Sequence, residues 1–189
     1  METKNMKLTF LAIGILLSTL TFAQSKSGGG EKFGQSFYAE LGGPGILFSA
    51  NYDRRFTKSN LGIGGRIGLG FVTGYDYTTV VTPYGYTTYG DRQRSVLTVP
   101  MQVNYLFGKP SSVSAFEVGL GATYTGKKLN IFDNYYGNSN DASSLYGTAS
   151  FMYRRMPKDG GFSWRVGFTP IFTKGYIQPS GGASIGYNF

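Results

Sequence analysis

The side chains of this chain that could carry out acid–base or ionic chemistry are few and widely spaced. Its 189 residues include no histidine and no cysteine, which removes Ser-His-Asp triads, Cys-His pairs and His-ligated zinc sites. Charged residues do occur singly within β-prone segments, at Glu40, Asp53, Arg66, Glu117, Arg154 and Arg165. Two of them, Glu40 and Glu117, have the side chains of a general acid and base, but structural ion pairing is the commoner use of such carboxylates.

Two other features resemble ligand sites only superficially. Residues 133–141 are rich in oxygen ligands, but their spacing does not fit a calcium loop. The glycine pairs Gly62/Gly64 and Gly119/Gly121 lack the strand-to-helix context of a nucleotide loop. We therefore predict no catalytic residue, no cofactor and no metal site, and expect that the chain is not an enzyme.

The segments that carry these charges are predicted to be β-strands. Hydrophobic residues make up only 41% of the chain, aromatic residues 16%, and there are 29 glycines, a composition typical of an all-β protein with many turns. Apolar and small or polar residues alternate with a period of two, and the charged residues fall on the small, polar face. This pattern predicts eight strands, at residues 36–41, 46–56, 61–72, 95–107, 114–125, 144–155, 162–172 and 176–189.

The division between the first two strands depends on Gly42–Gly45. The apolar face changes parity across this segment, which requires a hairpin or a β-bulge. We favour the hairpin, because a bulge would leave seven strands.

The distribution of charge predicts which face of the sheet is inside. The apolar face carries almost no charge and is aromatic near the strand ends, whereas the polar face is mainly glycine, serine and threonine. Small residues suit the narrow interior of an eight-stranded barrel, and charges there must pair. We predict a closed antiparallel up-and-down transmembrane β-barrel, with Arg66 and Arg165 paired to Glu40 and Glu117. The alternative is a soluble barrel whose apolar face forms the core.

The N-terminal residues are typical of export. Lys4 and Lys7 precede an apolar run from Leu8 to Leu17, and a small-residue cleavage site follows at Ala23. We expect a cleaved signal peptide over 1–23, a flexible leader over 24–35 and the barrel domain over 36–189. No later segment has about 20 consecutive apolar residues, so we expect no transmembrane helix.

Two long connections are predicted at 73–91 and 126–143. The first is β-prone and aromatic, at Tyr75, Tyr77, Tyr84, Tyr86 and Tyr89. It would be either a mobile surface loop or a protruding ribbon that turns near Pro83–Gly85. In the ribbon form these tyrosines would offer a recognition surface for an extracellular protein or glycan.

The net charge of +8 and the pI near 9.6 come from dispersed basic residues. They form no nucleic-acid-binding cluster, so we expect no nucleic-acid partner. We interpret the charge as an adaptation to an anionic surface.

Several segments carry a family resemblance. The chain ends in an alternating strand with Ile185, Tyr187 and Phe189 on one face. This end, together with residues 37–56, 99–108 and 165–170, resembles small outer-membrane β-barrel domain proteins of Gram-negative bacteria, of the eight-stranded type that includes OmpA and OmpX. The resemblance covers most of the chain after the leader.

The resemblance implies a location and partners rather than an activity. The last strand would close the barrel, and its terminal aromatic residue would be read by the barrel-assembly machinery. The protein would lie in outer-membrane lipid, with short periplasmic turns and longer outer loops. We expect a structural or surface-interaction role. The alternatives are a narrow passive pore for small solutes and a soluble exported barrel that binds an apolar ligand.

Overall fold

The computed structural model describes residues 34–81, 83, 87–129, 143–157, 159–173 and 176–189. The predicted signal peptide, and the leader up to residue 33, lie outside these ranges. The first described residues already contact the sheet, because Gln35 pairs with Arg54 and the Gly34 carbonyl accepts a hydrogen bond of 2.8 Å from the Arg55 amide. None of the described residues forms a helix with the length and apolar character that a membrane crossing requires.

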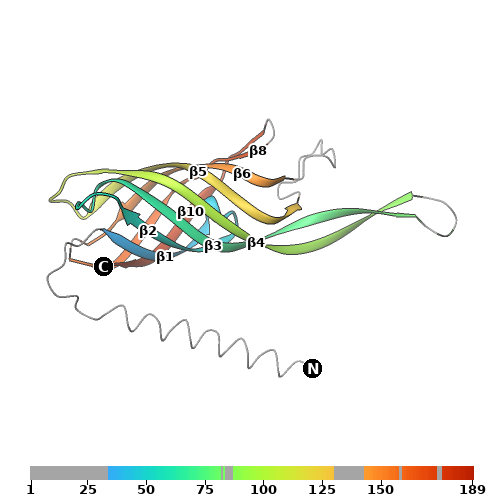
Figure 1. Cartoon of the computed structure of the whole chain (residues 1–189), viewed down its shortest axis with the longest axis horizontal. Helices are drawn as coiled ribbons and strands as arrows, with labels where there is room; N and C mark the ends of the chain where they lie inside the picture. The colour runs from blue at the N-terminus through green and yellow to red at the C-terminus, as the bar shows by residue number, and fades with distance from the viewer. Residues whose placement is uncertain (1–33, 82, 84–86, 130–142, 158, 174–175) are drawn as a thin grey trace, which may run out of the picture. The chain divides into compact units, whose positions relative to one another are not determined.

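Antiparallel strands form one sheet that closes on itself (Figure 1). The sheet order is β5-β4-β3-β2-β1-β10-β7-β6-β8-β9, and a β5–β6 pairing joins the two sides. The elements are β1 (Gln35–Gly42), η1 (Gly43–Gly45), β2 (Phe48–Arg55), β3 (Gly62–Val81), β4 (Thr87–Gly108), β5 (Ser114–Leu129), β6 (Ser143–Arg155), β7 (Gly161–Phe168), β8 (Ile171–Thr173), β9 (Tyr176–Gln178) and β10 (Gly181–Asn188).

These segments make an eight-stranded barrel, because two of its strands are each interrupted once. Segments β7 and β8 both pair with β6 and are separated at Thr169–Pro170. Their partners β10 and β9 are separated at Pro179–Ser180. Proline has no amide hydrogen for the ladder, so strands commonly break there. The predicted closed up-and-down barrel is confirmed, whereas the prediction of unbroken strands over 162–172 and 176–189 is wrong.

The two faces of the sheet have the predicted polarity. On β5, Phe116 and Leu120 are 64% and 70% exposed on the outer face, whereas Glu117 between them is 1% exposed. The same alternation puts large apolar side chains outside and polar ones inside on the other strands of the barrel. The structure therefore has the reverse of a soluble barrel's arrangement, in which apolar side chains fill the core.

The connection at Gly42–Gly45 is a hairpin, as predicted. Strands β1 and β2 pair up to Leu41 and Phe48, and η1 forms the turn between them. Gly42 and Gly43 have φ angles of 67° and 68°, which favour glycine. A Cβ atom on Gly43 would also lie 2.7 Å from the carboxyl carbon of Glu40. The turn therefore lies directly against a charged side chain of the interior.

The prediction of a loop over 73–91 is wrong, and the ribbon interpretation is confirmed. Segments β3 and β4 stay paired from Thr73–Ser95 to Val81–Thr87, because these residues are strongly β-prone. Pairing of β2 with β3 ends at Phe71, and pairing of β4 with β5 ends at Thr98. A two-stranded ribbon thus projects beyond the other strands, on the side away from the C terminus (Figure 1).

The turn predicted near Pro83–Gly85 lies largely outside the described residues, which omit 82 and 84–86. The predicted loop 126–143 is also shorter than expected. Segment β5 continues to Leu129 and β6 begins at Ser143, and residues 130–142 are not described. We call the end of the barrel with the ribbon the ribbon end. The end with the connections 56–61, 109–113 and 156–160, and with the C terminus, is the turn end.

The ribbon can be tested by cross-linking, because the natural chain has no cysteine. The hydroxyl oxygens of Thr73 and Ser95 are 3.0 Å apart, so the double variant Thr73→Cys/Ser95→Cys should oxidise to a disulfide. The control Thr73→Cys/Arg94→Cys should stay reduced, because Arg94 pairs with Gly74 and points to the opposite face of the ribbon. Thiol titration measures both. Equal oxidation of the two variants would contradict a fixed ribbon.

Candidate functional site in the barrel interior

The six charged residues singled out from the sequence come from six different strands. The structure places all of them in the interior of the barrel, and the most exposed of them, Arg154, is only 4% exposed. In strand order they are Glu40 on β1, Asp53 on β2, Arg66 on β3, Glu117 on β5, Arg154 on β6 and Arg165 on β7.

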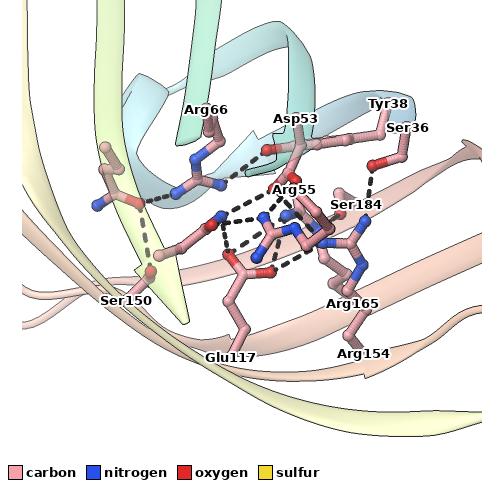
Figure 2. Close-up of polar contacts among 12 residues, drawn as sticks. Ser36, Tyr38, Asp53, Arg55, Arg66, Glu117, Ser150, Arg154, Arg165 and Ser184 are labelled. Carbon is pink, nitrogen blue, oxygen red and sulfur yellow. Dashed lines mark hydrogen bonds and ion pairs between the residues drawn. The ribbon is translucent and has the colours of Figure 1, made fainter. Parts of the chain in front are cut away.

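Glu117 holds one side of this network together (Figure 2). Its carboxylate lies 3.2 Å from Nη1 of Arg165 and 3.4 Å from Nη1 of Arg154. Nη1 of Arg154 also lies 3.4 Å from the Asp53 carboxylate. A single buried carboxylate therefore links two guanidinium groups from neighbouring strands, and Arg154 extends the network to the opposite side of the barrel.

Glu40 forms the other side. Its Oε1 atom lies 3.4 Å from Nη1 of Arg66 and 3.6 Å from Nη2 of Arg165. Arg66 also donates a hydrogen bond of 3.0 Å to the Tyr38 hydroxyl. The guanidinium carbon of Arg165 lies 3.4 Å from the centre of the Tyr38 ring, within the range of a cation–π contact. The predicted pairing of Arg66 and Arg165 with Glu40 and Glu117 is thus the arrangement that the structure has.

Other members of the network were not predicted. Arg55 donates hydrogen bonds to the carboxylate of Asp53 and the amide oxygen of Asn104, and one of 3.0 Å to the Gly62 carbonyl. Asn104 donates a 2.8 Å bond to Asp53. Both residues share the interior parity of their strands, and for Asn104, which lies within β4, alternation alone would have identified the inward direction. Arg55 ends its strand, where the pattern does not fix a side chain's direction.

Gln102 and Tyr38 were missed for a different reason. Gln102 accepts a hydrogen bond from Arg66, and its Nε2 atom donates to Thr148 at 3.0 Å. It is neutral and lies on β4, which contributes no charged residue to the network, so a prediction based on charge did not include it. Tyr38 lies on the interior face beside Glu40, where its ring and hydroxyl both contact arginines.

The network sets four arginines, at 55, 66, 154 and 165, against the three carboxylates Glu40, Asp53 and Glu117. Buried charges are costly unless they are paired and hydrogen-bonded, and each carboxylate here contacts at least one guanidinium group. Arg165 contacts both Glu40 and Glu117. This arrangement fills and braces the interior; neither carboxylate is exposed to a substrate in solvent.

Apolar side chains lie at both ends of the charged interior. At the ribbon end Val72 and Val96 pack with Ile46, which follows η1. The η1 turn is itself buried, and its carbonyls at Pro44 and Gly45 accept hydrogen bonds from Thr123 and Thr98 on the barrel wall.

At the turn end Leu106, Ala115 and Met156 form a second buried cluster with Leu61. Alternation predicted an interior made mainly of small and polar residues. The barrel needs apolar ones at its ends because turn and strand-end side chains fold over its openings.

The remaining predicted residues belong to the ribbon and to the last strand, β10. Tyr75 and Tyr77 belong to β3 and Tyr89 to β4, while Tyr84 and Tyr86 lie outside the described residues. Strand β10 pairs with β1 and β7 and so closes the barrel. Its Ile185 and Tyr187 are exposed on the outer face, and the Phe189 amide donates a 3.1 Å hydrogen bond to Gln35.

Comparisons with models of known protein families, with curated proteins and with solved structures found no match to this chain. The resemblance to small outer-membrane barrels therefore stays a prediction. Across the described ranges, no group of three or more acidic, histidine or cysteine side chains is arranged to hold a metal ion.

Glu117 should be the most sensitive position of the network. Glu117→Gln removes the carboxylate that pairs with Arg154 and Arg165 and should lower the free energy of unfolding by about 3–5 kcal/mol, because two buried guanidinium groups lose a counter-charge. Urea unfolding in phospholipid vesicles, followed by the gel mobility of the folded form, measures this.

The control is Ser150→Ala, which removes a single hydrogen bond of 3.2 Å to Gln102 and should cost about 1 kcal/mol. A Glu117→Gln protein no less stable than Ser150→Ala would show that the ion pairs do not hold the interior together.

Proposed function

We propose that this chain is an integral β-barrel protein of a Gram-negative outer membrane, with a structural and surface-interaction role rather than a catalytic one. The observation that carries the proposal is the inverted polarity of the barrel. Its outer face exposes large apolar side chains all around the barrel, while the charged residues of its inward, polar face are buried. Soluble monomers rarely expose contiguous apolar patches of more than a few hundred Å². Lipid is the solvent that suits such a surface.

The height of the apolar surface supports this proposal. The outward residues of β4 run from Leu97 to Phe107 without an outward charge, through Val99, Met101, Val103 and Tyr105. At ~3.3 Å per residue this row is about 33 Å long, and at a tilt of ~40° it covers about 25 Å along the barrel axis. That height matches the apolar band of membrane barrels.

Aromatic side chains gather at the turn end. Tyr105 and Phe107 have ring centroids 4.5 Å apart, and Tyr153 lies 5.5 Å from Trp164 and 5.7 Å from Phe116. Tyr187 and Phe189 stack at 6.4 Å. Girdles of this kind lie at the lipid–water boundaries of membrane barrels.

The connections support an orientation. The turn end carries the short connections and the C terminus, and the ribbon end carries the long extension. In membrane barrels the short turns face the periplasm and the long connections face outward. We infer that the ribbon projects from the cell surface. Export by the predicted signal peptide, and recognition of Phe189 by the barrel-assembly machinery, are parts of the same proposal.

The filled interior supports a closed barrel over the two alternatives. A passive pore needs a continuous water path, whereas the described part of the interior holds the charge network between the two apolar clusters, with η1 folded into the ribbon end. A soluble carrier of an apolar ligand needs an apolar cavity inside, and here the interior side chains are mainly polar.

The surface role is carried by the ribbon. Among the described residues, β3 beyond Val72 pairs only with β4, and β4 before Thr98 pairs only with β3. Along this stretch each strand therefore has an outer edge to which no other described strand is paired, and such edges accept an added strand from a partner. We propose that the ribbon binds an extracellular protein or glycan.

The membrane location can be tested with one charge on the outer face. Leu120 lies midway along the outward row of β5, so Leu120→Arg should destabilise the barrel in bilayers by about 2–4 kcal/mol. The control Val113→Arg, in a turn near the boundary, should cost at most about 1 kcal/mol. Both are measured as the loss of the compact, heat-modifiable gel band during urea unfolding.

A second result is needed from the same preparations. The wild-type protein should stay with the membranes after a carbonate wash. Release by carbonate, together with equal stability of the two arginine variants, would place the apolar face in a protein complex or in a soluble assembly instead.

The ribbon can be removed without touching the barrel. Replacing Thr78–Gly90 by Asn-Gly, a pair that suits a two-residue hairpin turn between the paired residues Tyr77 and Asp91, should leave the heat-modifiable band unchanged and abolish ribbon-dependent attachment of expressing cells to extracellular matrix. Cells that carry the folded, shortened protein and attach as well as wild-type cells would contradict the surface role.

A further inference from the structure

The outer face of the barrel has one hollow whose lining the described residues define well. A shallow, open groove of about 540 Å³ crosses β2, β3, β4 and β5. Its walls are almost wholly apolar side chains, including Tyr52, Phe56, Ile67, Val103 and Leu120. Four of them point outward from their strands, and Phe56, in the connection after β2, is also exposed, so the groove faces the surroundings of the barrel and not its interior.

Gly65 forms the floor of this groove. It occupies the outward row of β3 between Ile63 and Ile67, where it contributes no side chain. Its neighbours across the sheet are Arg54 on β2 and Val103 on β4. A Cβ atom at Gly65 would lie 2.8 Å from the Phe56 ring, so this ring leans over the glycine and forms one wall. The groove thus follows from a missing side chain in an otherwise complete apolar row.

The groove has a cation in its lining. Arg54 lies directly across from Gly65 and is exposed on the outer face. It is the penultimate residue of β2, next to the turn end. The described turn end is basic overall: Lys58, Lys109 and Arg155 are exposed there, against the one acidic side chain Asp159. An anionic group at this level would be attracted both by Arg54 and by the surrounding charge.

We propose that this groove holds one acyl chain of an anionic phospholipid of the inner leaflet, with its phosphate on Arg54. This inference rests on the proposed membrane location, which puts the turn end at the periplasmic boundary. Lipid tails are as apolar as leucine, so apolar contact alone selects no lipid in a membrane. Selection comes from the shape of the groove and from the guanidinium–phosphate contact, which is charge-assisted and can be bidentate.

Native mass spectrometry of the full-length folded barrel in detergent tests this, with phosphatidylglycerol and phosphatidylethanolamine as the two probes. Wild-type protein should retain one phosphatidylglycerol in preference to phosphatidylethanolamine. Arg54→Gln should weaken retention about tenfold, the effect of losing a charge-assisted hydrogen bond. Val103→Trp, which fills the groove, should weaken retention of both lipids.

Two matched variants control for general effects. Arg155→Gln removes an outward charge at the turn end away from the groove. Val118→Trp adds an outward ring on β5 at a residue that does not line the groove. Both should bind phosphatidylglycerol like the wild type. Retention that is equal in all five proteins, or that Arg155→Gln lowers as much as Arg54→Gln, would overturn the site in favour of unspecific attraction to the basic end.

The folded gel band separates this test from the proposed function. A wild-type chain that gives no heat-modifiable band in lipid would contradict the membrane barrel itself. A chain that folds and inserts but shows no difference between Arg54→Gln and Arg155→Gln would contradict only the lipid site. Arg54 is on the surface, so its substitution gives a folded test protein even where Val103→Trp does not.

Discussion

Compensation of charge inside a closed sheet is the constraint on which the rest of this structure depends. Once β10 pairs with β1, every second side chain of the barrel wall points into a narrow interior and loses contact with water. A charge there is tolerated only beside a counter-charge and with its hydrogen bonds made. Six strands each contribute one of the predicted charges, and the sheet's register brings them to overlapping levels, so that Arg165 reaches both Glu40 and Glu117.

The same constraint explains features that look unrelated to charge. Gly119 leaves room for Gln102, whose Oε1 atom would lie 3.1 Å from a Cβ atom at that position. Gly43 allows η1 to lie against Glu40. The two apolar clusters lie beyond the polar layer, where turns and strand ends fold over the openings of the barrel. The charged side chains thus pair with one another in the middle of the barrel, and the apolar side chains pack together at its two ends.

The outer face of the barrel is apolar, and the few positions that interrupt its apolar rows indicate where a ligand could bind. Its apolar rows are nearly continuous, so a missing side chain at Gly65 produces a groove and a charge at Arg54 gives that groove a polarity. Its two ends also differ. The turn end carries aromatic rings and basic turns, whereas the ribbon end carries a two-stranded ribbon. The two ends of a uniform barrel would be equivalent in a membrane. The differences between the ends of this barrel favour one orientation, and the proposed roles at the cell surface and at the inner leaflet depend on that orientation.

The sequence alone determined the fold class, the parity of the strands and the inward direction of the charges, since alternation with a period of two is a local property of an extended chain. From a change of parity it also required a hairpin or a β-bulge at Gly42–Gly45, and the pairing of β1 with β2 shows that it is the hairpin. The sequence did not determine that residues 73–81 and 87–95 pair, because the same β-prone, aromatic composition is compatible with a strand and with a surface loop. Only the tertiary structure decided which charges meet, that Arg55 and Tyr38 join them, and that Gly65 opens a groove. These depend on the register between strands that are distant in sequence, and the pattern within one strand carries no information about that register.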